Sequence, residues 1–221
     1  MILDSELQTA KKYFPNTQLL FKNESALMKL LAVLLFFNKD FSTKFITAIG
    51  SKIYFPSQQR LAELHPIDAK SIFIHELIHI YDSSKLFKIF FSLSYLSPQI
   101  FTLLALPFLL ISWKLSLLCL IFLLPIPSYF RMYFELRAYK VSLYALHHLS
   151  NKFGYTTNLH QAKEYYTKQF TSSAYYFMFP FKSYIEKEFD DAIKRISLGA
   201  KPFDDKVFEM VDEIINNSTM A

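Results

Sequence analysis

The sequence predicts a mainly helical α+β fold, with a small β-hairpin or sheet and an apolar helical hairpin inserted between two of its helices. Only three of the 221 residues are glycine, which favours long helices over a turn-rich β fold. Helical apolar spacing recurs along most of the chain, whereas residues 86–130 are almost continuously apolar. We therefore expect residues 1–221 to form a single domain, with residues 86–130 as an insertion.

The first part of the chain is expected to contain a helix followed by a β-hairpin. Residues 1–40 have a helical pattern, with Asn23 or Ser25 as the cap before ALMKLLAVLLFF. The apolar run 26–37 is too short to cross a bilayer and predicts a buried helix. Residues 41–56, FSTKFITAIGSKIYFP, are rich in β-branched and aromatic residues around a glycine, which predicts a hairpin or a bent strand.

The apolar run of residues 86–130 predicts a transmembrane or re-entrant hairpin. From residue 99 to 130 its only charge is Lys114. A single helix of this length would be longer than a bilayer core requires, and four prolines would interrupt it. Two helices with a turn near Trp113–Lys114 fit the pattern better. The alternative is a buried hairpin inside a soluble protein, but the run lacks the polar face of a helix at a globular surface.

The distribution of charge predicts the orientation of this hairpin and excludes one class of partner. Basic residues lie on both of its flanks: Arg60, Lys70, Lys85, Lys88, Arg131, Arg137 and Lys140. The positive-inside rule then directs both flanks to the cytoplasm. The formal charge of +5 is dispersed, without a basic patch interleaved with aromatic residues, so no nucleic-acid partner is expected. The single cysteine, Cys119, excludes an internal disulfide.

A metal-binding motif lies in the helix expected from Ile67 to about Ser84. The segment HELIH places His75 and His79 four residues apart, so that both imidazoles project from one helix face and can share a zinc ion. Glu76 lies beside them, where it can act as the general base on a zinc-activated water. The alternative is a helix with ordinary polar histidines. Burying two unpaired imidazoles and a carboxylate in this apolar context would be costly, and a metal ion removes that cost.

A catalytic zinc ion also needs a third protein ligand and an open coordination position. Glu135 is the preferred candidate because it lies in an aromatic, apolar helical segment, YFELRAYKVSL, directly after the apolar run. Asp82 lies on roughly the same face as His79 but farther along the axis, which suits a supporting or surface role. His65 and His160 lie in polar surroundings and are expected to be exposed.

The order of these elements resembles that of the HtpX-like membrane gluzincins. HELIH is followed by two apolar segments and then by a helix that carries ELRAY, in place of the E-x-x-A-D helix of that family. The resemblance covers about residues 67–145 and implies a zincin-like metallopeptidase domain with one Zn²⁺ per chain. It implies His75, His79 and Glu135 as the zinc ligands and Glu76 as the general base.

The chain departs from the family pattern at two points. The aspartate expected four residues after the third ligand is Tyr139, and the downstream His-Pro segment is missing. Candidates for a supporting or oxyanion-stabilising group are therefore Tyr139, Asp82, His147, His148 and Arg195. The segment ITAIGSKIYFP is similar to the strand that zincins place beside the substrate, which makes Gly50, Ile53 and Tyr54 candidates for pairing with an extended peptide.

Together these patterns predict a zinc-dependent, membrane-associated endopeptidase whose active site faces the cytoplasm. Its expected partners are a protein or peptide substrate and a lipid bilayer. The alternative is a catalytically inactive, zinc-binding module anchored to the membrane. The presence of Glu76 favours the enzyme, since a carboxylate that is not a metal ligand has no purpose in an inactive site.

Overall fold

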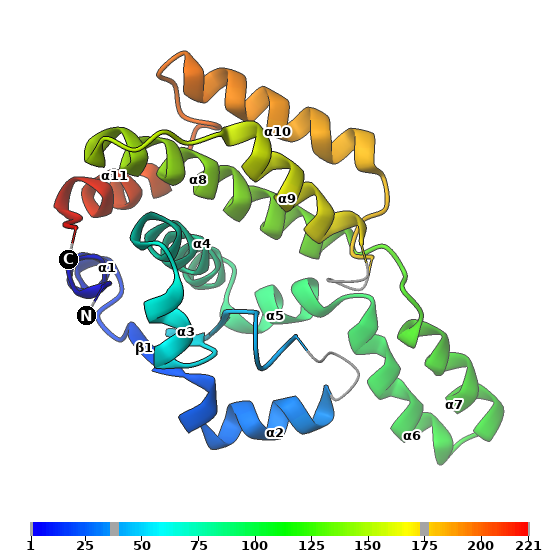
Figure 1. Ribbon diagram of the computed structural model, residues 1–221. Coiled ribbons are helices and arrows are strands. Elements are labelled where there is room, and N and C mark those ends of the chain that lie inside the picture. Colours follow the sequence, from blue (N-terminus) through cyan, green and yellow to red (C-terminus); the bar gives the residue numbers. More distant parts are fainter. Residues whose placement is uncertain (1, 36–39, 173–176, 221) are drawn as a thin grey trace. The chain divides into compact units, whose positions relative to one another are not determined.

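The structure, a computed structural model, describes residues 2–35, 40–172 and 177–220 (Figure 1). As predicted, it is mainly helical with a small sheet. The elements of the first half are α1 (Asp4–Tyr13), β1 (Gln18–Phe21), the 3-10 helix η1 (Lys22–Glu24), α2 (Ala26–Leu34), β2 (Thr47–Ile49), β3 (Lys52–Phe55), α3 (Gln58–Glu63), α4 (Pro66–Lys85), α5 (Lys88–Leu96), η2 (Gln99–Leu104) and α6 (Ala105–Leu109). They are followed by α7 (Trp113–Cys119), η3 (Leu120–Leu123), α8 (Tyr129–Phe153), α9 (Leu159–Thr171), α10 (Lys182–Ser197) and α11 (Val207–Asn217).

The described chain divides into two compact units. The first comprises residues 1–81, 138–159 and 191–221, and the second comprises residues 82–137 and 160–190. Helices α4 and α8 are each continuous and contribute residues to both units. The HELIH motif lies in the first unit, and the apolar segment 86–130 lies wholly in the second.

The sheet of the first unit has three strands in the order β1-β3-β2. Strands β2 and β3 form the predicted antiparallel hairpin, in which Thr47 is paired with Tyr54. Gly50 lies in the connecting turn with φ of +61°, a conformation that glycine adopts without steric cost. Strand β1 pairs parallel to β3 within a region that was expected to be helical. That expectation was wrong because the stretch QLLF is stabilised by pairing with a distant strand rather than by local helical propensity.

Helix α2 begins where one of the two predicted caps lies. The Ser25 side chain accepts a hydrogen bond from the backbone N–H of Met28, which satisfies one of the unpaired donors of the first turn. Met28 packs in a cluster with Phe41 and Tyr54. The prediction of a buried helix was wrong for the opposite face, which exposes large apolar side chains: Leu27, Leu30 and Val33. Residues 36 and 37 of the predicted run lie outside the described residues.

Helix α4, which carries HELIH, closely matches the predicted range and is anchored in the first unit by a buried ion pair. Lys70 and Glu6 are both fully buried, and the Lys70 ammonium donates to the Glu6 carboxylate at 2.5 Å. The same ammonium donates to the backbone oxygen of Ile2 at 3.1 Å. These bonds fix α4 to α1 about one and a half helical turns before the first histidine of the motif.

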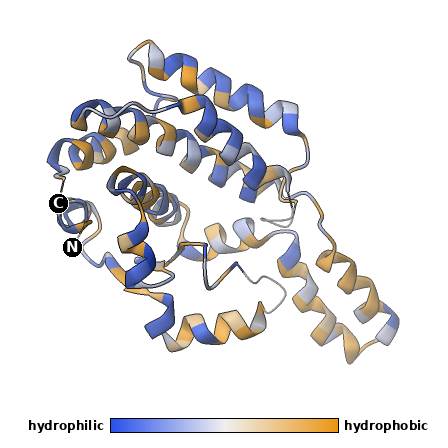
Figure 2. Ribbon diagram, viewed as in Figure 1, coloured by the Kyte–Doolittle hydropathy of each residue, from blue (hydrophilic) through white to orange (hydrophobic). Residues whose placement is uncertain are grey.

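The apolar segment of the second unit is broken into short helical elements instead of the two longer helices expected. α6 and α7 pack side by side, and Figure 2 shows that both are strongly hydrophobic. The turn between them precedes Trp113, which begins α7. Among the described residues no single helix is long and apolar enough to cross a membrane. The two consecutive helical segments Lys88–Leu96 and Gln99–Leu109, which meet at a bend of 91°, are together long and apolar enough by length and composition.

The apolar pattern after Arg131 predicts helices at residues 131–150, 158–170, 182–197 and 203–216, with Gly199 as a stop signal between the last two. The observed helices follow these ranges closely. α8 and α9 differ from them by a few residues, and α10 agrees with its expected range. The predicted stop signal Gly199 has φ of +74°. Helix α11 begins later than expected because the Asp205 carboxylate accepts a hydrogen bond from the backbone N–H of Val207, which starts the helix there.

Candidate metal centre

The two histidines of HELIH converge as their spacing predicts. Both lie on α4 and both are buried, with 8% of each side chain exposed. The Nε2 atoms of His75 and His79 are 3.3 Å apart. Two nitrogens bound to one zinc at 2.0–2.1 Å in a tetrahedral arrangement would be about 3.3 Å apart. The pair therefore has the separation that a shared metal ion requires.

Ser142 on α8 contacts the ring of His75 at Nδ1, the nitrogen that does not face His79. Its hydroxyl donates to the backbone oxygen of Ala138 at 3.1 Å, and it lies 3.2 Å from Nδ1 of His75. Because the hydroxyl hydrogen is committed to Ala138, Ser142 accepts from an Nδ1–H group of His75. This tautomer leaves the Nε2 lone pair directed at His79 and available to a metal ion.

The expected supporting residue Tyr139 contacts the same imidazole in a different way. Its ring centroid lies 4.5 Å from that of His75, and the two rings are tilted by 58°. Tyr139 therefore packs against the ring, while Ser142, one turn later on α8, accepts the hydrogen bond from Nδ1–H. The serine was not singled out from the sequence, although it lies two helical turns after Glu135 and so on the same face of the helix.

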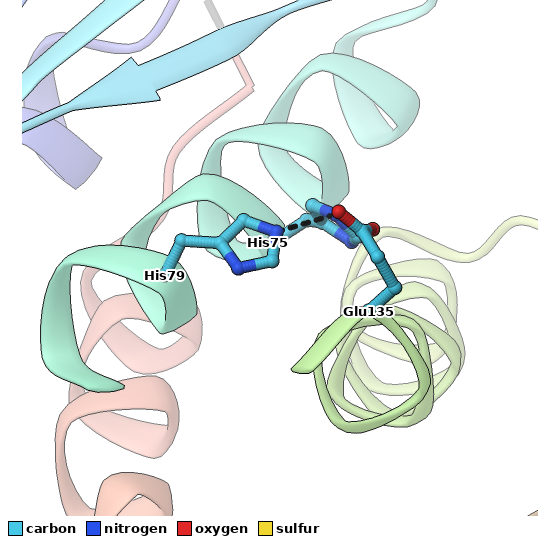
Figure 3. Close-up of side chains that lie close together, drawn as sticks. All are labelled: His75, His79 and Glu135. Carbon is cyan, nitrogen blue, oxygen red and sulfur yellow. Dashed lines mark hydrogen bonds between the residues drawn. The ribbon is translucent and has the colours of Figure 1, made fainter. Parts of the chain in front are cut away.

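Glu135 joins the two histidines (Figure 3). His75, His79 and Glu135 each offer one ligand atom, and these atoms lie within 4.8 Å of one another. Only 2% of Glu135 is exposed. Two imidazole nitrogens and one carboxylate oxygen form a donor set that suits zinc, with a coordination position left for a water molecule or a substrate. The residues present therefore fit a divalent metal ion of this class.

Glu76, the predicted general base, is buried next to the ligand pair and lies within electrostatic reach of a cation. Lys22, in η1, is only 3% exposed. Its ammonium donates to the backbone oxygen of Phe41 at 2.7 Å and lies 3.9 Å from the centre of the Phe41 ring. Burial lowers the pKa of Lys22 to about 8, and the negative charge of Glu76 opposes this shift. No local sequence pattern indicates Lys22, because it is brought near Glu76 by the fold.

Asp82 takes part in an ion pair rather than in the metal group. Both of its carboxylate oxygens accept from Nε of Arg137, at 3.0 and 3.2 Å. Asp82 is 6% exposed, so this is a largely buried pair. It joins the last turns of α4 to the segment of α8 that carries Glu135. The expected supporting role of Asp82 at a metal site stays a prediction.

The other candidate supporting residues have partners elsewhere. His147 bonds to Asn151 one turn farther along α8, at 3.0 Å. The ring of His148 packs 4.2 Å from that of Tyr144, and burial lowers the pKa of His148. Arg195 donates to the backbone oxygen of Lys201 at 2.7 Å in the loop after α10. These contacts connect none of the three to the ligand pair.

Of the three strand candidates, Ile53 and Tyr54 lie in β3 and Gly50 lies in the turn before it, and the pairing expected of them is not available. β3 is the central strand, hydrogen-bonded to β1 on one side and to β2 on the other. Ile53 is paired with both neighbours and Tyr54 packs in the core, while Gly50 lies in the turn. An extended peptide adds to an edge strand, so the expected role of these three residues in substrate pairing was wrong.

Comparisons with known proteins leave this geometry as the main guide to function. No protein family, curated protein or solved structure shows significant similarity to the chain.

Proposed function

We propose that the protein is a zinc-dependent, membrane-associated endopeptidase. The observation that carries the proposal is the convergence of His75, His79 and Glu135, with Glu76 buried directly beside them on α4. The spacing of the imidazoles and the mixed nitrogen and oxygen donor set favour zinc. A structural zinc site normally has four protein ligands, so the set of three found among the described residues favours catalysis.

The side chains around the proposed zinc site have different roles. Zinc bound there would lower the pKa of a water molecule and polarise a peptide carbonyl. Glu76 takes a proton from the attacking water and delivers it to the departing amine. Ser142 keeps His75 in the tautomer that can bind metal. The positive charge of Lys22 attracts the Glu76 carboxylate and helps to hold it in place.

The membrane association rests on the apolar segment of the second unit. Several of its large side chains are strongly exposed, among them Leu106 at 71%, Leu110 at 91% and Ile111 at 74%. Large apolar side chains exposed together within one segment are typical of a surface that contacts a membrane or another protein. We propose that the segment enters the membrane from its cytoplasmic side as a re-entrant or spanning hairpin, and that the flanking basic residues keep the metal centre on the cytoplasmic side.

The enzymatic part of the proposal is tested with an unfolded protein as substrate. Purified wild type should hydrolyse it, lose activity with a chelator and recover activity with zinc. Glu76→Gln should be inactive, and the exposed Glu63→Gln on α3 should match wild type. If wild type binds zinc but neither it nor Glu76→Gln cleaves any substrate, the inactive membrane module is the correct alternative.

The membrane part is tested by fractionation. Wild type should remain with membranes after an alkaline wash. Replacing Leu106, Leu110 and Ile111 together with serine should release the protein, whereas replacing the exposed Leu198 after α10 should not. Recovery of wild type in the aqueous fraction would contradict membrane insertion and favour a hairpin packed against protein.

A further inference from the structure

The third ligand candidate is held by a residue of the apolar segment. The hydroxyl of Tyr95, in the last turn of α5, donates a short hydrogen bond to Oε1 of Glu135. Both residues belong to the second unit. Glu135 is almost fully buried. A glutamate side chain has several rotamers, so neighbouring residues must hold its carboxylate in the one orientation that can bind a metal ion.

Tyr95 is itself held by contacts with two neighbouring residues, Arg131 and Phe91. Nε of Arg131 on α8 donates to the backbone oxygen of Tyr95 at 3.1 Å, and the guanidinium lies 5.3 Å from the centre of the tyrosine ring. Phe91, one turn earlier on α5, stacks on Tyr95 with 5.8 Å between ring centroids. Phe91 also packs against Phe134, the neighbour of Glu135, at 4.7 Å. The Tyr95 hydroxyl therefore has a defined place relative to the carboxylate.

These contacts form one connected arrangement between α5 and the start of α8. Arg131 lies one turn before Glu135 on the same face of α8. The helix that carries the Glu135 carboxylate therefore also binds Tyr95, the residue that contacts this carboxylate. Tyr95 lies in the first half of the bent apolar pair described above. The segment proposed to enter the membrane thus contacts the proposed metal ligand through a hydroxyl group.

We propose that Tyr95 is a positioning residue, which holds the Glu135 carboxylate in the orientation that binds the metal ion and so makes the metal affinity depend on where α5 lies. The inference rests on the proposed metal site. One carboxylate oxygen accepts from the tyrosine, and the carboxylate retains a ligand oxygen for the cation. Partners of this kind make a ligating carboxylate a better and more rigid donor.

The test uses the full chain in detergent, with metal affinity as the readout. Tyr95→Phe keeps the ring and its stacking but removes the hydroxyl. Its zinc affinity, measured by competition with a chelating indicator, should fall about 10- to 100-fold. The visible absorption of the Co²⁺-loaded protein should also change, because the oxygen ligand is displaced. Tyr133→Phe, on the neighbouring exposed tyrosine of α8, should match wild type in both.

The same Tyr95→Phe change made in the Glu135→Gln variant distinguishes an effect on the Glu135 carboxylate from a general effect on the structure. In Glu135→Gln, the further change Tyr95→Phe should leave zinc affinity as it is, since the group that the hydroxyl orients has been altered. An equal loss in both backgrounds, or no loss in wild type, would overturn the role of Tyr95 alone. A wild type that binds neither zinc nor cobalt would overturn the proposed function and the inference together.

Discussion

The buried lysine beside Glu76 predicts an unusual dependence of stability on pH. At neutral pH the ammonium of Lys22 is charged in both the folded and the unfolded chain, but only the folded chain buries it. Its folded-state pKa is about 8, against 10.5 for the exposed group. At about 1.4 kcal/mol per pH unit, the lowered pKa corresponds to an upper estimate of about 3 kcal/mol of lost stability at neutral pH.

The sign of the pH dependence follows from proton binding. Above the folded-state pKa of Lys22 the folded chain has released its proton while the unfolded chain still holds one, so stability increases with pH until about 10.5. Lys22→Met removes the ionisable group with a similar side-chain length. The unfolding free energy of wild type relative to Lys22→Met should therefore rise by about 2.5 kcal/mol between about pH 7 and about pH 10.

The assay is denaturant unfolding of both proteins in detergent with excess chelator, so that metal binding does not contribute. Lys29→Met, on the exposed face of α2, serves as the control and should show a constant difference from wild type across this range. If the difference between wild type and Lys22→Met stays flat or falls as the pH rises, then Lys22 is not buried as a charged group, and its placement near Glu76 is wrong.

Two further changes test the supports of α4. Glu6→Gln leaves Lys70 buried without its carboxylate partner and should lower the unfolding free energy by about 3–5 kcal/mol, measured by denaturant unfolding, whereas Glu63→Gln at the surface should have little effect. Ser142→Ala removes the acceptor at Nδ1 of His75 and should weaken zinc binding about 10- to 100-fold by chelator competition. Unchanged stability or unchanged zinc affinity would refute the respective role.

The elements with strong local signals could be predicted from the sequence. The helical spacing around HELIH and ELRAY predicts α4 and α8 to within a few residues, and the β-branched residues around Gly50 predict the hairpin. The spacing within α4 also predicts that His75 and His79 converge, because four residues make about one helical turn. These features depend on periodicity within a single element, which a single sequence reveals.

Features that depend on distant pairing could not be predicted in this way. Strand β1 exists because it pairs with β3, and no periodicity in QLLF indicates this. Lys22 reaches the neighbourhood of Glu76, and Tyr95 reaches Glu135, only through packing between separate elements. The apolar segment was expected to form two helices, but composition alone did not show where its prolines and turns divide it into shorter ones.

The zinc content of three purified proteins tests the central claim most directly. Wild type and Glu76→Gln should each contain about one zinc per chain, because a general base acts on the water rather than on the metal. Glu135→Gln should contain much less, since the change weakens the third ligand that lies with His75 and His79. A wild type without zinc when prepared without chelator, or a Glu135→Gln variant with an undiminished zinc content, would contradict the assignment of this metal centre.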